Sequence, residues 1–213
     1  MPRRLIMLLS LCGMAFPPQH AKTARAGDPA FPIEHVKTAR AGDPAFAGQA
    51  SGVWLDVPFV KQEDEGCGAA SIAMVIQYWQ KQQPESNIAN PDPVAIQRVL
   101  YSRKAHGIYA SDLKRYFHEH SFTTYTFQGA WDDLRHHLEK GRPLIVALKP
   151  SRGEVSLHYV VVVGLDWNQN VVQLNDGAQR KLLKEDRNKF EKEWNAGGRW
   201  TLLALPQLPG TSR

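Results

Sequence analysis

A cysteine stands where the sequence changes from strand-like to helical. Before it, residues 53–60 are mostly apolar, and Pro58 interrupts regular strand pairing. After it, four apolar residues follow the 3, 4, 7 spacing of one helix face: Ile72, Val75, Ile76 and Trp79. Cys67 therefore falls in the first turn of a predicted helix, where free N–H groups and the helix dipole favour the thiolate. We interpret Cys67 as a candidate nucleophile, because the thiolate is the reactive form of cysteine.

Further helices are predicted before the main run of strands. Asp92 and Pro93 have the pattern of a helix N-cap followed by proline, and an apolar face then comprises Val94, Ile96, Val99 and Leu100. Ser111 is the expected N-cap of a third helix, and residues 131–138 predict a fourth that ends before Gly141. Residues 122–127 alternate like a short strand.

The C-terminal half is predicted to be a sheet. Residues 144–148 and 158–166 are apolar enough for buried strands, a turn at 168–170 follows, and residues 171–177 and 198–206 supply further strands. Helices followed by an antiparallel meander predict an α+β fold, with an N-terminal helical part packed on a C-terminal antiparallel β-sheet.

The N-terminal segment has the pattern of an export signal. Arg3 and Arg4 precede a dozen mostly apolar residues, a run too short for a comfortable membrane span. Small-x-small cleavage motifs end at Ala26 and again at Ala41. We assign residues 1–26 as a signal peptide. Lipidation of Cys12 is disfavoured, because Leu11 stands where a small residue is needed.

A short unit is duplicated after the apolar run. The sequence KTARAGDPAF occupies residues 22–31 and recurs without change at 37–46. Two copies cannot build a solenoid, and the composition is that of a flexible linker. We therefore predict a linker at 27–51, one domain at 52–206 and a tail at 207–213.

The charge pattern bears on partners and location. The net charge is +5, but Lys and Arg are scattered among Asp and Glu without a basic block. This is typical of a solvated surface, so no nucleic-acid partner is expected. The signal predicts an extracytoplasmic protein, periplasmic or secreted, with no integral membrane domain beyond the signal segment; an uncleaved signal would hold it at the membrane.

A cysteine nucleophile needs a base, and His158 is the strongest candidate among eight histidines. It starts a long apolar strand, so its ring can project at the end of the sheet. The others lie in the linker, in turns or on helices, and none shows the HExxH spacing of a zinc site. Without a ligand cluster, and without a second thiol once the signal is removed, we expect no metal and no cofactor.

Two further residues complete the candidate site. Asp176 ends the strand that follows His158 around the predicted hairpin, within diagonal reach of it, and could orient the imidazole. An oxyanion needs hydrogen-bond donors. The backbone N–H of Cys67 is one candidate donor, and the side-chain amide of Gln62, on the preceding loop, is another.

Three segments of the chain resemble the C39 and C39-like cysteine peptidases. Residues 57–75 are similar to the nucleophile segment of that family, 158–164 to its histidine strand and 174–177 to its aspartate strand. Residues 141–146 and 190–200 also fit, so the resemblance covers roughly residues 52–206. One departure is Gly177, where many relatives have proline.

The resemblance implies a papain-like fold, a triad of Cys67, His158 and Asp176, and Gln62 in the oxyanion hole. We therefore expect an exported cysteine peptidase that acts on a peptide or protein. Familiar relatives are transporter domains that cut leader peptides after a double glycine; the export signal here argues against assuming that substrate. A peptidyl or γ-glutamyl transferase and a non-catalytic peptide-binding module remain alternatives.

Overall fold

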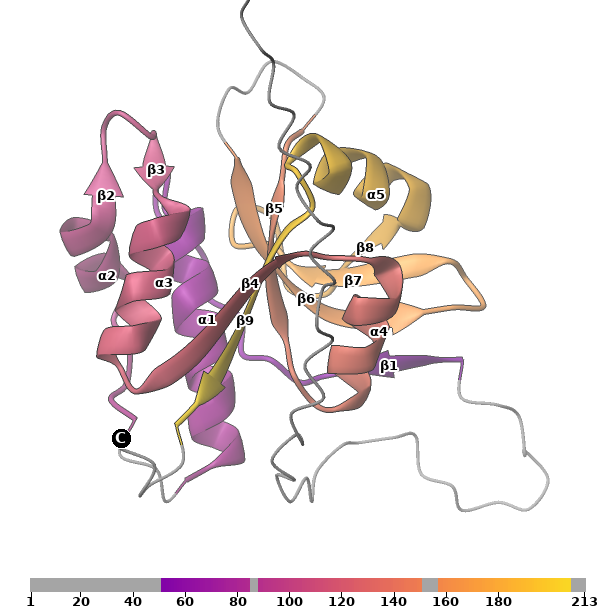
Figure 1. Cartoon of the computed structure of the whole chain (residues 1–213), viewed down its shortest axis with the longest axis horizontal. Helices are drawn as coiled ribbons and strands as arrows, with labels where there is room; N and C mark the ends of the chain where they lie inside the picture. The colour runs from indigo at the N-terminus through magenta and orange to yellow at the C-terminus, as the bar shows by residue number, and fades with distance from the viewer. Residues whose placement is uncertain (1–50, 85–87, 151–156, 208–213) are drawn as a thin grey trace, which may run out of the picture. The chain divides into compact units, whose positions relative to one another are not determined.

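The computed structural model describes residues 51–84, 88–150 and 157–207 (Figure 1). The predicted signal peptide and all of the predicted linker except Ser51 lie outside these residues, as does the tail beyond Gln207. Within the described ranges, no helix has the length and apolar character needed to cross a membrane.

The helical part is built around α1 (Cys67–Gln82), which is buried along most of its length. It contacts α2 (Pro93–Leu100), α3 (Ala110–Glu119), and the short hairpin of β2 (Tyr101–Ser102) and β3 (Gly107–Ile108). Small residues at the start of α1 allow this close packing: a Cβ on Gly68 would lie 3.1 Å from the Cβ of Ile108. The first turn of α1 is therefore fixed on the hairpin side.

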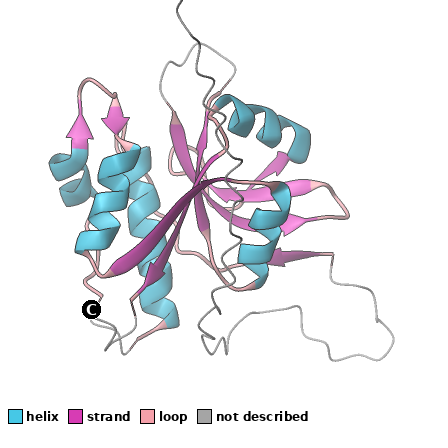
Figure 2. Ribbon diagram, in the orientation of Figure 1, coloured by secondary structure: helices cyan, strands magenta, loops and turns pink. Residues whose placement is uncertain are grey.

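The sheet has seven antiparallel strands in the order β4-β9-β5-β6-β7-β8, with β1 also paired to β6. Figure 2 shows the strands in magenta, with helices in cyan beside them. The strands are β1 (Gly52–Trp54), β4 (Phe122–Gln128), β5 (Leu144–Leu148), β6 (His158–Asp166), β7 (Val171–Asn175), β8 (Leu183–Asp186) and β9 (Trp200–Pro206). In Figure 1, α1, α2 and α3 lie on one side of the strands, with α4 (Trp131–Glu139) and α5 (Arg187–Ala196) on the other. The predicted α+β class is confirmed.

The long strand β6 is the centre of the sheet. One edge of β6 pairs first with β5 and then with β1, while the other edge pairs with β7. The β7 register shifts between Val162 and Gly164, where a Cβ on Gly164 would lie 2.8 Å from the Val53 carbonyl oxygen. Partners on both edges and layers on both faces explain why this segment is a continuous apolar run.

The predicted meander is wrong in one respect. Strand β9 lies between β4 and β5, and it is preceded by β8 and α5, which the sequence pattern did not predict. The sheet therefore joins strands far apart in the chain, and β4 becomes an edge strand.

Two of the predicted helix details have different outcomes. The Asp92 cap is confirmed, since its Oδ1 accepts a 2.9 Å hydrogen bond from the N–H of Val94. The Ser111 cap is wrong, because α3 begins at Ala110 after Tyr109, with no side-chain cap. The predicted apolar face of α2 is also only half correct: Ile96 and Leu100 are buried, one turn apart, whereas Val94 and Val99 are exposed.

His137 on α4 makes the fold sensitive to acid. Burial, followed by the charge of Arg142, lowers the pKa of His137 to about 4, and within the described residues its buried Nδ1 has no hydrogen-bond partner. The folded state therefore favours the neutral ring. This stability is present above the unfolded pKa of about 6.5 and is lost as the pH falls toward 4. We expect the melting temperature of His137→Leu to fall less between pH 6.5 and 4 than that of the wild type; parallel curves would contradict this assignment.

Candidate active site

Cys67 is the first residue of α1 and is 9% exposed. Gly66, at the N-cap, offers no side chain to the free N–H groups of the first turn, and that turn contains no acidic residue. These N–H groups and the positive end of the helix are therefore available to stabilise a thiolate or another anion beside Cys67.

His158 and Asp176 meet beyond the last residue pair that joins β6 to β7. His158 is the first residue of β6, and Asp176 directly follows β7, whose last residue, Asn175, pairs with Val161. The His158 Nε2 lies 2.9 Å from the Asp176 Oδ1. The structure thus brings together the two residues that hairpin geometry predicts as neighbours.

Asp176 is almost fully buried, and each of its carboxylate oxygens accepts a further hydrogen bond. The N–H of Ala178 donates to Oδ1 at 2.9 Å and the Nε2 of Gln179 to Oδ2 at 2.7 Å. Burial alone would raise the pKa of Asp176. The hydrogen bond and charge of His158, with the Ala178 and Gln179 donors, outweigh burial and lower the pKa below its ordinary range. Asp176 is therefore a fixed negative charge beside His158 near neutral pH.

The imidazole of His158 is held in its protonated form. Burial would lower the pKa of His158, but hydrogen bonds with Asp176 and Cys67, and the charges of both, raise it to about 10. Because Nε2 bonds to Asp176, Nδ1 is the ring nitrogen left to face the thiol. A protonated imidazole and the free N–H groups at the start of α1 therefore both lie beside Cys67, an arrangement suited to a cysteine nucleophile.

Gln62 lies against the turn that follows Asp176. Its backbone N–H donates to the Gly177 carbonyl at 3.0 Å, and its Cβ would be 3.2 Å from a Cβ placed on Gly177. The Oε1 is buried without a hydrogen-bond partner among the described residues, and the Nε2 makes no bond to any of them either. The side-chain amide therefore remains available as a donor.

Two supporting residues escaped the sequence reasoning. Asn175 is fully buried; its Nδ2 donates to the Val57 carbonyl at 3.1 Å, and its Oδ1 accepts from the N–H of Leu182 at 3.0 Å. It ties the end of β7 to the segment that leads to Cys67. Gln179, three residues after Asp176, holds the carboxylate; that short spacing in a turn was the only signal in the sequence for its role.

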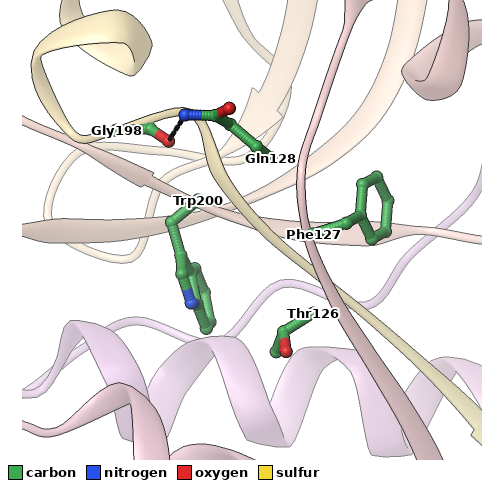
Figure 3. Close-up of a pocket in the computed structure, with 5 residues that line it drawn as sticks. All are labelled: Thr126, Phe127, Gln128, Gly198 and Trp200. Atoms are coloured by element: carbon green, nitrogen blue, oxygen red, sulfur yellow. Dashed lines mark hydrogen bonds between the residues drawn. The ribbon is translucent and has the colours of Figure 1, made fainter. Parts of the chain in front are cut away.

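Tyr159 links the candidate site to Trp200, which lines a pocket on the sheet (Figure 3). The pKa of Tyr159 is raised to about 12 by burial and then by the charge of Cys67, which places this ring near the thiol. The Tyr159 ring packs edge-on against Trp200, with centroids 5.5 Å apart. The pocket is lined by Thr126, Phe127, Gln128, Gly198 and Trp200.

Among residues 51–84, 88–150 and 157–207, no three His, Cys, Asp or Glu side chains gather as a metal site. His106 contacts Glu65 and His120 stacks on Tyr116, so these two rings are engaged away from His158. What the described site can do chemically is nucleophilic attack by a thiol with an adjacent acid and base.

The family comparison covers most of the described chain. The model of the Peptidase_C39 like family matches residues 54–201. Comparison with curated proteins found no match.

Solved structures similar to this chain include cysteine peptidases. A protein from Bacillus anthracis described as a C39-like peptidase has a TM-score of 0.58 and 19% identity, covering 73% of this chain and 98% of its own. Xylellain, a cysteine protease from Xylella fastidiosa, has a TM-score of 0.54 and 13% identity, covering 76% and 88%. A double glycine motif protease from an AMS/PCAT transporter, in complex with the leader peptide, has a TM-score of 0.53 and 20% identity, covering 72% and 94%. At these identities the likeness establishes the fold, which is papain-like.

Proposed function

We propose that this chain, which belongs to the Peptidase_C39 like family and is a cysteine peptidase, cleaves peptide bonds through Cys67, His158, Asp176 and Gln62. The observation that carries the proposal is the placement of His158 between a buried carboxylate 2.9 Å away and a thiol at a helix N-terminus.

The proposed reaction proceeds through a thioester. The Cys67 thiolate attacks the carbonyl carbon of the scissile bond, and the resulting oxyanion accepts hydrogen bonds from the Gln62 Nε2 and the Cys67 N–H. His158 gives its proton to the leaving amine as the C–N bond breaks. Water then attacks the thioester, His158 takes a proton from it, and the acid product leaves Cys67. Asp176 keeps the imidazole oriented and stabilises its charged form.

The proposed substrate is a peptide or protein segment outside the cytoplasm. The family supports a peptide substrate, and one similar structure is a protease in complex with a leader peptide. The basic and apolar N-terminus supports export. We do not carry over cleavage after a double glycine.

Product analysis in labelled water tests the proposal. The protein without its signal is incubated with a peptide library in H₂¹⁸O, with and without an added amine, and products are identified by mass spectrometry. Hydrolysis places ¹⁸O in the new carboxyl group, whereas a transferase would yield amine adducts. Cys67→Ala is the control. Peptide binding without turnover by the intact protein would instead identify a binding module.

Trp200 is expected to contribute to substrate binding. It lines the pocket and contacts Tyr159, which lies near Cys67, so a side chain of a bound peptide can pack on its ring. We expect Trp200→Ala to raise KM about tenfold while kcat changes by less than about threefold. Tyr125→Ala is the matched control, because Tyr125 is an exposed aromatic residue of β4 outside the pocket. A lower kcat at constant KM would contradict a binding role.

A further inference from the structure

The turn that leads into Cys67 contains a backbone conformation that most residues avoid. Glu65, two residues before the nucleophile, has a φ of 55°, in the left-handed region that favours glycine. The N–H of Gly66 closes this turn by donating to the Glu63 carbonyl at 2.9 Å. The position of Cys67 therefore depends on a turn that its own sequence does not favour.

The hairpin of β2 and β3 holds this turn from outside. The Tyr101 hydroxyl donates to one oxygen of the Glu65 carboxylate, and the His106 Nδ1 lies 3.2 Å from the other. From α2, the Gln97 Nε2 donates to the Asp64 carbonyl at 2.5 Å. The hydrogen bond from Tyr101, followed by the contact with His106, lowers the pKa of Glu65, so the carboxylate is ionised near neutral pH.

The same hairpin also contacts α1. Tyr101 pairs with Ile108 across the hairpin, and Ile108 packs against Gly68, directly after Cys67. The hairpin thus contacts residues on both sides of Cys67 in the sequence: Glu65 before it and Gly68 after it. The Glu65–His106 pair is exposed, and such a pair contributes little to the free energy of unfolding. We therefore expect the contact to affect the position of Cys67 more than the stability of the fold.

We propose that Glu65 is a positioning residue, whose side chain, held by Tyr101 and His106, fixes the turn that presents Cys67 to His158. The proposal rests on the proposed role of Cys67 as nucleophile. Glu65 touches neither substrate nor the reacting atoms in this role; it acts through the backbone of the segment that ends at Cys67.

Substitutions at Glu65 separate the backbone conformation from the side-chain contacts. Glu65→Gly adopts the left-handed conformation without strain but removes both contacts, while Glu65→Gln keeps an acceptor for Tyr101 and loses the charge. Tyr101→Phe removes the hydroxyl that donates to the Glu65 carboxylate and leaves Glu65 itself unchanged. Glu63→Gln is the matched control, because Glu63 is an acidic residue in the same segment whose side chain makes no hydrogen bond or ion pair with the described residues.

Three quantities are measured: kcat and KM for a peptide that the wild type cleaves, the rate of Cys67 alkylation by iodoacetamide, and the melting temperature. We expect Glu65→Gly to lower kcat and the alkylation rate by about tenfold, with KM and the melting temperature nearly unchanged. Glu65→Gln and Tyr101→Phe should show smaller losses of both rates. The double variant with Tyr101→Phe and Glu65→Gly should lose little more kcat or alkylation rate than Glu65→Gly alone, because both substitutions break the same hydrogen bond between Tyr101 and Glu65.

Several outcomes would overturn the proposal. Wild-type rates in Glu65→Gly would mean that the side-chain contacts are dispensable, and a rise in KM alone would mean that Glu65 binds substrate. A lower melting temperature with an unchanged alkylation rate would mean a purely structural role. Alkylation needs no substrate, so this arm tests the proposal even if no peptide is cleaved. Failure of the proposed function itself has another signature, a wild-type Cys67 that reacts no faster than the cysteine of a model peptide.

Discussion

Replacing Cys67 by alanine is expected to abolish peptide hydrolysis while leaving the fold intact. The thiol is the only nucleophile that the proposed mechanism places at the junction of α1 and the sheet, so kcat/KM should fall on the order of 10⁴-fold or more. The side chain is small and the backbone of the first turn is unaffected, so stability should change by only about 1 kcal/mol. The measurement is kcat/KM with a cleaved peptide, beside circular dichroism and a melting curve.

Residual activity is the outcome that matters most for Cys67→Ala. Turnover within about tenfold of the wild type would exclude Cys67 as the nucleophile, because catalysis without the nucleophile retains only the contribution of binding and the oxyanion hole. Glu63→Gln, prepared in the same way, should keep wild-type activity, which would show that the loss in Cys67→Ala does not come from the preparation.

Asp176→Ala is expected to have the second largest effect, on both activity and stability. It leaves His158 partly buried without its acceptor, and Gln179 without its partner. We expect kcat/KM to fall by about 10²- to 10⁴-fold and stability by about 3–5 kcal/mol, as for a buried pair that loses one partner. Asp176→Asn should retain more activity than Asp176→Ala, because the amide oxygen can still accept from the imidazole.

The pH dependence of this stability loss identifies its cause. The lowered pKa of Asp176 gives stability that is present above its unfolded pKa of about 3.9 and is lost at lower pH. The raised pKa of His158 gives stability that is complete below its unfolded pKa of about 6.5 and is lost as the pH rises toward 10. Urea unfolding of the wild type and Asp176→Ala should differ most near pH 5–6 and least near pH 10. A constant difference would mean that the loss comes from packing, not from charge.

The parts of the fold with strong local patterns could be predicted from the sequence. The apolar runs gave β5 and β6 with the bounds that the structure has, and the Asp92–Pro93 pair located the start of α2. Helix α5 was missed because only Phe190 and Trp194, one turn apart, are buried in a segment that is otherwise polar. Strand β8 is short and polar, and the insertion of β9 between β4 and β5 depends on contacts with no local pattern.

The candidate site also has a part that the sequence predicts and a part that it does not. Cys67, His158 and Asp176 each lie at the end of an element that the sequence predicts. Hairpin geometry predicted that His158 and Asp176 are neighbours, and the family resemblance implied that Cys67 joins them. The contacts that hold the site are longer in range and less regular: Asn175 reaches Val57, and Tyr101 reaches Glu65. Neither residue type nor spacing distinguishes these side chains from ordinary polar residues, because their roles appear only when the turns are placed in space.

The most direct test of the central claim is the pH profile of Cys67 alkylation in the wild type and His158→Ala. Iodoacetamide labelling is followed by mass spectrometry from pH 5.5 to 9, with circular dichroism to show that both proteins are folded. For an ordinary thiol, with a pKa of about 8.5, the alkylation rate below that pH falls about tenfold for each unit by which the pH is lowered. We predict a wild-type rate that is already high at pH 6 and nearly constant to pH 8, and an ordinary thiol profile in His158→Ala. An ordinary profile in the wild type would contradict a thiolate held by His158, and with it the proposed mechanism.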